Sequence, residues 1–166
     1  MTFSLRSGVQ ITCAAKIEEH AGNCSGFVQA VCDALCIFVP SGLNPATTSR
    51  ADDQIEGLTG YSFHVPELAL FIGRGSPGEA NGMGLAFHGQ LIICGLTSAE
   101  LNAEASRRKR VVHGHVAILT GNRSATGWPE AFYGVYGSPD RAGKPGSLSN
   151  CFRRGDRDQI AYFRLG

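Results

Sequence analysis

Apolar residues recur at helical spacing in the first quarter of the chain. The spacing is that of the buried stripe of an amphipathic helix, which we expect to begin near Cys24 and to end before Pro40. A weaker pattern of the same period predicts a shorter helix over 10–20, stopped by Gly22. The stripe of the longer helix consists of Phe27, Val28, Val31, Cys32 and Leu35.

Farther along, the pattern changes from that of a helix to that of a strand. Apolar runs predict four strands, over 90–94, 111–120, 132–136 and 159–165. A shorter run at 68–72 fits a strand or a buried turn of helix equally well. Helices first and strands afterwards predict an α+β protein whose helices pack on one antiparallel sheet.

Glycine dominates the region 73–84, which we interpret as a flexible loop. Within it, Gly73-Arg74-Gly75-Ser76-Pro77-Gly78 matches the G-x-G-x-x-G pattern of dinucleotide sites. That pattern binds a dinucleotide when a helix follows at once, and Pro77, Gly82 and Gly84 argue against such a helix. The pattern therefore gives little support to a nucleotide site.

Three shorter signals lie in the second half of the chain. Thr97-Ser98-Ala99-Glu100 has the form of a capping box and predicts a short helix. The basic run 107–110 is interpreted as a solvated loop rather than as a patch for an acidic ligand. The Gly-, Ser- and Pro-rich stretch 137–149 predicts a connecting loop.

Length and composition are those of a soluble globular protein, and we expect a single domain over 1–166. With 15 Lys+Arg against 14 Asp+Glu, the formal charge of +1 lacks the strong positive excess of sequence-independent nucleic-acid binders. No apolar run reaches the roughly 18 residues of a membrane span. Residues 1–7 lack the basic and apolar segments of a secretory signal. We expect a protein made in the cytoplasm, without nucleic-acid partner or membrane insertion.

The chain has six cysteines, too few for a disulfide scaffold and without the paired C-x-x-C spacing of a zinc site. We expect Cys32 and Cys36, one helical turn apart, to be buried free thiols. Cys13 and Cys151 lie near the two ends of the chain, and the sequence allows them to pair in an oxidising compartment.

Cys24 is the candidate nucleophile. It falls in the first turn of the predicted helix, where unpaired N–H groups and the positive end of the helix dipole stabilise a thiolate. Gly22 and Gly26 flank it, and we interpret them as keeping side chains away from the sulfur.

A nucleophilic cysteine needs an imidazole to take its proton and return it to the leaving amine, and His115 suits that role. It follows Gly114, which would leave room for substrate, and precedes an apolar run that makes the strand rigid. His113 shares its face, because residues two apart in a strand point the same way. Nearer the strand's start, His113 is interpreted as a solvated rim residue.

Two segments of the chain, 23–28 (Asn-Cys-Ser-Gly-Phe-Val) and 114–118 (Gly-His-Val-Ala-Ile), resemble the motifs of the NlpC/P60 cysteine peptidases. This papain-like superfamily cuts peptide bonds in bacterial cell-wall peptides. With segments 29–31, 89–96 and 156–162 included, the chain resembles the type VI secretion amidase effectors, small antibacterial toxins built on the same fold.

The resemblance runs from about Ile11 to Leu165, with 73–84 and 98–110 as additions. It implies a papain-like fold in which N-terminal helices pack on an antiparallel sheet. Asp156 and Asp158 match the relatives, although surface pairing with a neighbouring arginine, Arg154 or Arg157, explains them equally well.

By this resemblance, Cys24 is the nucleophile and His115 the general base and acid, without metal or cofactor. A polar residue on the next strand orients the histidine in many relatives, and Tyr133, Tyr136 and Ser138 stand there. Tyr136 aligns best and is the candidate orienting residue, although a core role explains it as well. The Cys24 backbone N–H would help to hold the oxyanion.

The resemblance also implies a route and partners. The protein would leave its producer through the type VI secretion apparatus, act in the periplasm of a Gram-negative target cell and cleave the peptide stems of peptidoglycan. We expect the γ-D-glutamyl to meso-diaminopimelate bond, with the D-alanyl to diaminopimelate cross-link as the alternative. A cognate immunity protein would protect the producer, and the oxidising destination would favour a bridge between Cys13 and Cys151.

Two other hypotheses remain open. A metal-dependent hydrolase could use His113, His115 and a cysteine as ligands, since a two-residue spacing on a strand can ligate zinc. A binding module for the cell wall could keep the same fold without turnover, although the intact Cys24 and His115 argue against it.

Overall fold

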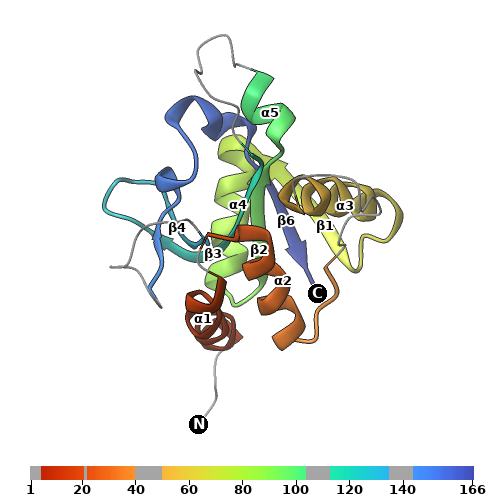
Figure 1. The fold of residues 1–166 in the computed structure, drawn as a ribbon, viewed down its shortest axis with the longest axis vertical. Helices are drawn as coiled ribbons and strands as arrows, with labels where there is room; N and C mark the ends of the chain where they lie inside the picture. Colours follow the sequence, from red (N-terminus) through yellow and green to blue (C-terminus); the bar gives the residue numbers. More distant parts are fainter. Residues whose placement is uncertain (1–4, 21, 40–49, 104–112, 135–143) are drawn as a thin grey trace.

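The computed structural model describes residues 5–20, 22–39, 50–103, 113–134 and 144–166 (Figure 1). Six strands form one sheet in the order β1-β6-β2-β3-β4-β5, and each neighbouring pair is antiparallel. The elements are α1 (Leu5–Lys16), η1 (Glu18–His20), α2 (Cys24–Ala34), α3 (Arg50–His64), β1 (Ala69–Arg74), α4 (Gly75–Phe87), β2 (Leu91–Leu96), α5 (Ser98–Ala103), β3 (His115–Arg123), β4 (Pro129–Phe132), β5 (Gly146–Ser147), η4 (Leu148–Asn150), η5 (Arg154–Gln159) and β6 (Ala161–Leu165).

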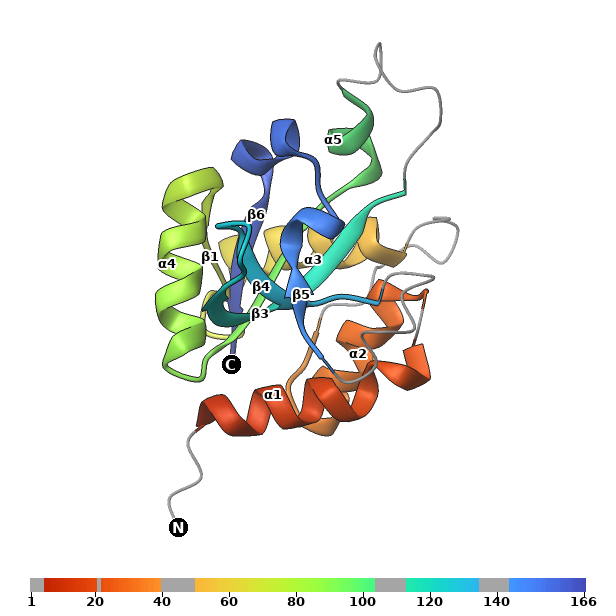
Figure 2. The same cartoon turned by 90° about the vertical axis from the view of Figure 1, so that its left-hand side faces the viewer.

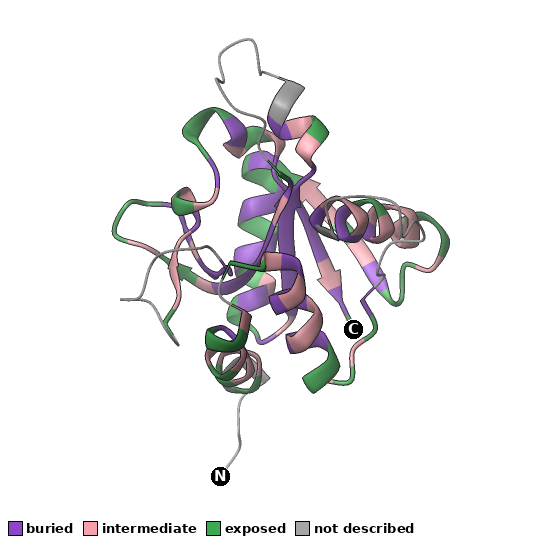
Figure 3. Ribbon diagram, viewed as in Figure 1, coloured by how far each residue is buried: buried purple, intermediate pink, exposed green. Residues whose placement is uncertain are grey.

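Helices cover both faces of this sheet (Figure 2). α2 and α3 pack on one face and α4 on the other, while α1 packs against α2. Side chains of β3 alternate between the two layers: Val116 and Ile118 join the core beneath α2, whereas Ala117 and Leu119 join the core beneath α4. The strands between the helices are the most buried part of the fold (Figure 3). The expected α+β class, with helices packed on an antiparallel sheet, is confirmed.

The loop prediction for 73–84 is wrong, because most of this region is helix α4. Pro77 lies in the first turn, where its missing N–H removes no helical hydrogen bond. A Cβ at Gly78 would lie 2.5 Å from the carbonyl carbon of Gly73 and 2.8 Å from the ring of Tyr162. Gly75 has a φ of +56°, and its N–H donates to Ile160 O at 3.0 Å. The glycines therefore allow the helix to lie close to β1 and β6, which accounts for the G-x-G-x-x-G pattern by internal packing.

Other predicted elements occur with shifted bounds. The first helix begins at Leu5 rather than at residue 10 and ends at Lys16, before the short η1 turn. The run 68–72 forms β1. The third predicted strand, β4, begins earlier than expected, at Pro129, and ends at Phe132. Helices α4 and α5 lie between strands, so the expected order of helices first and strands afterwards is wrong in this part of the chain.

The capping box is confirmed. The Thr97 N–H donates to Glu100 Oε2 at 2.8 Å, and the Glu100 N–H donates to Thr97 Oγ1 at 3.2 Å. Residues 40–49, 104–112 with the basic run, and 135–143 lie outside the described residues.

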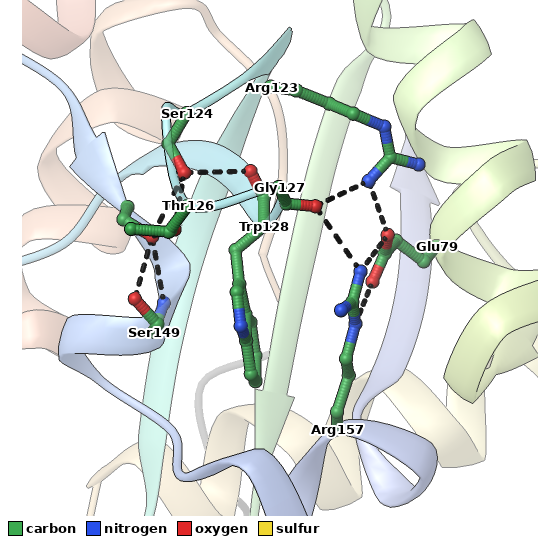
Figure 4. A network of polar contacts seen from close by, with 9 residues as sticks. Glu79, Arg123, Ser124, Thr126, Gly127, Trp128, Ser149 and Arg157 are labelled. Atoms are coloured by element: carbon green, nitrogen blue, oxygen red, sulfur yellow. Dashed lines mark hydrogen bonds and ion pairs between the residues drawn. The ribbon is translucent and has the colours of Figure 1, made fainter.

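A polar network ties α4 to the β3–β4 turn and to η5 (Figure 4). Glu79, whose side chain is 4% exposed, pairs with Arg157 at 2.7 Å and with Arg123 at 2.9 Å. Arg123 also donates to Gly127 O at 2.9 Å, and the Arg157 guanidinium lies 4.7 Å from the centre of the Trp128 ring. Burial alone would raise the pKa of Glu79, but the hydrogen bonds from the two arginines outweigh it and lower that pKa.

The structure gives one of the C-terminal residues a buried partner. Arg157 donates to both carboxylate oxygens of Glu79. Asp156 is buried, and its carboxylate accepts the Arg153 N–H at 2.8 Å, which caps η5. This aspartate therefore helps to fix the turn before β6.

All six cysteines are free thiols. Cys32 is buried as expected, but Cys36 is exposed, because the chain turns out of α2 there with a φ of +55°. Cys13 lies in the core beneath α1 and α2, whereas Cys151 packs against the core on the other face of the sheet. The predicted bridge between Cys13 and Cys151 is therefore absent from this fold. None of the described helices is long and apolar enough to cross a membrane.

Candidate active site

Cys24 is the first residue of α2, as the sequence predicted. Asn23 caps the helix, because its Oδ1 accepts the Gly26 N–H at 2.9 Å. A Cβ at Gly26 would collide with the Asn23 carboxamide, and Gly22 adopts a φ of +83°. These two glycines therefore serve the turn and the cap that start the helix, which replaces our interpretation that they clear space around the sulfur.

The sulfur of Cys24 faces three backbone N–H groups. Burial raises the thiol pKa, and hydrogen bonds from the N–H groups of Val116, Ser25 and Cys24 itself oppose it without cancelling it. The thiol pKa therefore lies above its usual value, and Cys24 is a neutral thiol at neutral pH. The expected thiolate is not favoured in this state, because Cys24 packs against the core beneath α2.

His115 is the first residue of β3 and pairs with Leu96 across to β2. Its ring packs edge-on against Phe152, with the ring centres 5.8 Å apart. Burial lowers the pKa of His115 to about 4, so the imidazole is neutral at neutral pH. Its Nε2 is buried and has no hydrogen-bond partner among the described residues. A neutral imidazole with a vacant acceptor has the properties of a general base.

The structure brings Cys24 to the start of β3, because its sulfur accepts a hydrogen bond from the residue next to His115. The two side chains nevertheless lie in different layers. Cys24 packs against the core beneath α2, whereas Leu96 and Phe152 around the imidazole belong to the core beneath α4. Within the described part of the chain, no hydrogen bond joins thiol and imidazole. The imidazole would have to turn toward the sulfur, and catalytic hydrogen bonds often tighten only when substrate binds.

The third catalytic position is only partly described. Tyr136 and Ser138 lie outside the described residues. Tyr133 is buried in the core beneath α4, where its hydroxyl accepts a hydrogen bond from Asn150. Phe152 is the side chain that packs on the imidazole, and nothing in the spacing of the sequence singled it out.

His113 is exposed, as expected for a rim residue. In the ranges that the structure describes, no three or more His, Cys, Asp and Glu side chains gather as metal ligands would. The metal hypothesis therefore gains no support from this part of the chain.

Gly114 has a different role from the one we expected. A Cβ there would collide with Asp52 Oδ1 of α3, so the space beside Gly114 is filled by this side chain and is not open to a substrate. Asp52 accepts hydrogen bonds from the backbone N–H of Ser98, at 2.6 Å, and from its hydroxyl. Gly114 therefore allows α3, α5 and the start of β3 to meet.

The sequence reasoning missed a second residue of α3. Gln54 is 4% exposed, and its Nε2 donates to the backbone oxygen of Ser25, next to Cys24, at 2.9 Å. The signal was present in the sequence, because Gln54 interrupts an apolar stripe formed by Ala51, Ile55 and Leu58. No helix was assigned to this part of the chain from the sequence, so this stripe was not recognised.

Comparison with protein-family models gives no match, and no curated protein matches the sequence. Conclusions about function therefore depend on the motifs around Cys24 and His115 and on the geometry that the fold gives them.

Proposed function

We propose that the protein is a cysteine amidase that hydrolyses an amide bond in the peptide stems of bacterial peptidoglycan. The observation that supports this most is the position of Cys24. Its sulfur lies at the first residue of α2, among three backbone N–H groups, and one of these belongs to the residue that follows His115. This places a nucleophile and donors for negative charge next to the start of β3, the strand whose first residue, His115, is the candidate base.

The reaction begins with proton transfer from the Cys24 thiol to Nε2 of His115. The sulfur attacks the carbonyl carbon of the stem amide, and the resulting tetrahedral oxyanion is stabilised by backbone N–H groups at the start of α2. The carbon–nitrogen bond then breaks, and the imidazolium returns the proton to the leaving amine. Water, deprotonated by His115, hydrolyses the thioester and releases a carboxylic acid and the free thiol.

The charge state of the resting site leaves the imidazole unprotonated, as a general base must be. The pKa of His115 is lowered to about 4 and the pKa of Cys24 is raised, so both groups are neutral near pH 7. The thiol is therefore deprotonated by His115 once substrate is bound and is not a thiolate in the resting site. We expect kcat/KM to fall on the acidic side only as the pH approaches about 4, where the imidazole is protonated.

The resemblance to type VI secretion amidase effectors supports the rest of the proposal. The substrate bond is the γ-D-glutamyl to meso-diaminopimelate amide, and the site of action is the periplasm of a target cell reached through the secretion apparatus. The partners are the peptide stem of peptidoglycan and a cognate immunity protein.

Digestion of purified Gram-negative peptidoglycan tests the activity. We expect the wild type to release fragments whose masses identify the bond, and Cys24→Ala and His115→Ala to release none. Cys36→Ala is the matched control, because Cys36 is an exposed thiol at the other end of α2. Full release of fragments by Cys24→Ala would exclude the mechanism. Wild-type protein that cosediments with peptidoglycan and releases nothing would instead identify a binding module.

A further inference from the structure

We propose that Gln54 of α3 positions the turn that carries Cys24, a role that rests on the proposed function. Gln54 is distant from Cys24 in sequence and was not part of either motif. It meets the site through the main chain, because its Nε2 donates to the Ser25 backbone oxygen at 2.9 Å in a fully buried contact.

This hydrogen bond completes the restraint of one peptide group. The peptide between Ser25 and Gly26 has its oxygen held by Gln54 and its N–H held by the Asn23 side chain at 2.9 Å. The N–H of Ser25, one peptide earlier, is among the donors that face the Cys24 sulfur. Fixing this peptide at both ends therefore fixes the direction of a donor to the nucleophile.

The same turn of α3 also fixes the start of β3. Asp52 fits against Gly114, which precedes His115. A Cβ at Gly95, which pairs with Val116, would lie 2.9 Å from Ile55 Cδ1. One helical turn thus contacts the neighbours of both the nucleophile and the base, and it links two segments that are far apart in the sequence.

Gln54 is a poor choice for stability alone. Its Oε1 is buried and has no hydrogen-bond partner among the described residues, and such an acceptor costs about 1–3 kcal/mol. The other residues on this face of α3, among them Ala51, Ile55 and Leu58, are apolar and belong to the core. An apolar side chain of similar length at position 54 would fill the same space without the unpaired oxygen. The hydrogen bond to the Ser25 oxygen is therefore what the polar side chain supplies at this position.

The first variant is Gln54→Met, which keeps the length of the side chain and removes the donor. We expect kcat on peptidoglycan to fall by about 10- to 100-fold, because the nucleophile loses its alignment. We expect the melting temperature to stay the same or rise, because the unpaired acceptor is also removed. Gln10→Met is the matched control: Gln10 Nε2 donates to Thr120 O at 3.0 Å, at the opposite end of β3, and its loss should leave kcat unchanged.

A readout without substrate follows the thiol itself. The pH dependence of iodoacetamide labelling, measured by mass spectrometry of the peptide containing Cys24, reports the thiol pKa. We expect its midpoint to move to higher pH in Gln54→Met, because the Ser25 N–H is no longer held toward the sulfur. Gln10→Met should keep the wild-type midpoint.

Gln54→Glu tests the donor without changing the shape of the side chain. A neutral carboxyl can donate to Ser25 O, whereas a carboxylate repels it. Burial raises the pKa of such a carboxyl, so activity should return as the pH falls below that value. It should be lost again only near about 4, where His115 becomes protonated. Recovery in acid would separate hydrogen bonding from mere space filling.

The role of Gln54 is overturned if Gln54→Met keeps both the wild-type kcat and the wild-type labelling midpoint. It is also overturned if Gln54→Glu has the same pH profile as the wild type. Peptidoglycan left intact by the wild type would overturn the proposed function alone, because the labelling midpoint reports on Gln54 without any substrate.

Discussion

Two buried polar regions of this fold differ in how completely their hydrogen bonds are satisfied. Beneath α4, the Glu79 carboxylate accepts hydrogen bonds from Arg157 and Arg123 with both of its oxygens. Around the start of β3, Gln54 Oε1 on the α2 and α3 side of the sheet and His115 Nε2 on the α4 side are buried without partners in the described part of the chain.

The difference distinguishes structure from function. A buried carboxylate surrounded by arginines is neutralised where it lies and joins α4, the β3–β4 turn and η5 into one unit. Unpaired buried polar groups weaken the folded state, and near Cys24 a substrate or the reaction can use them. We therefore assign the Glu79 network to stability and the groups around Cys24 and the start of β3, among them Gln54 and His115, to the reaction.

The largest effect is expected when the satisfied network is broken. Glu79→Ala leaves two arginines without their common partner and removes several charged hydrogen bonds. We expect a loss of about 3 kcal/mol in the free energy of unfolding, measured in urea. The specific activity of the remaining folded protein should be unchanged. A loss of activity beyond the loss of folded protein would contradict the assignment of this network to structure.

A smaller effect is expected when acid protonates His115. The unfolded chain binds a proton at His115 near its ordinary pKa of 6.5, whereas the folded protein binds it only near about 4. Unfolding is therefore favoured as the pH falls between these values, and His115 contributes full stability only above about 6.5. Between pH 7 and pH 4.5 the unfolded chain completes most of this proton uptake and the folded protein little of it, so we expect a loss of about 2 kcal/mol.

Urea titrations at pH 7 and pH 4.5 measure this loss, and His115→Leu is the control. We expect the variant to lose about 2 kcal/mol less than the wild type over the same interval. Glu79 does not interfere, because its pKa is lowered from 4.5 and its contribution is lost only below that pH. Equal acid sensitivity in the two proteins would show that His115 is not buried as described.

The smallest effect is expected from removing a buried hydroxyl in the region beneath α4 that we assign to structure. The hydroxyl of Tyr162, beneath α4, is a third buried group without a partner in the regions described. Its ring occupies the space left by Gly78 and Gly82, away from Cys24. We expect Tyr162→Phe to raise the free energy of unfolding by up to about 1 kcal/mol and to leave kcat unchanged. A large loss of activity in this variant would contradict the assignment of the region beneath α4 to structure.

The sequence was informative where one local pattern decides the structure. The start of α2 at Cys24, the buried run of β2 and the capping box before α5 follow from periodicity and capping chemistry, and all three are confirmed. The prediction that His115 lies in a strand is also confirmed, but β3 begins at His115 rather than at residue 111, so His113 lies outside it.

The sequence was misleading where long-range packing outweighs local preference. Glycine and proline predicted a loop over 73–84, but most of this region is helix α4. Gly78 packs so closely on Gly73 and Tyr162 that a side chain there would not fit, and this packing outweighs the low helix propensity of glycine. Local patterns likewise could not show that Asp52 fills the space beside Gly114 or that Gln54 reaches Ser25. These contacts join residues that are far apart in the chain, so they depend on the sheet order.

The most direct test of the central claim is a search for the covalent intermediate on Cys24. Wild-type protein is mixed with soluble peptidoglycan stem peptides, quenched in acid within the first turnover, and its intact mass and proteolytic peptides are measured. We predict a mass increase equal to the acyl part of the stem, located on the peptide that contains Cys24, and absent from Cys24→Ala. Hydrolysis of the stem by the wild type without any adduct on this peptide, or by Cys24→Ala, would contradict the account.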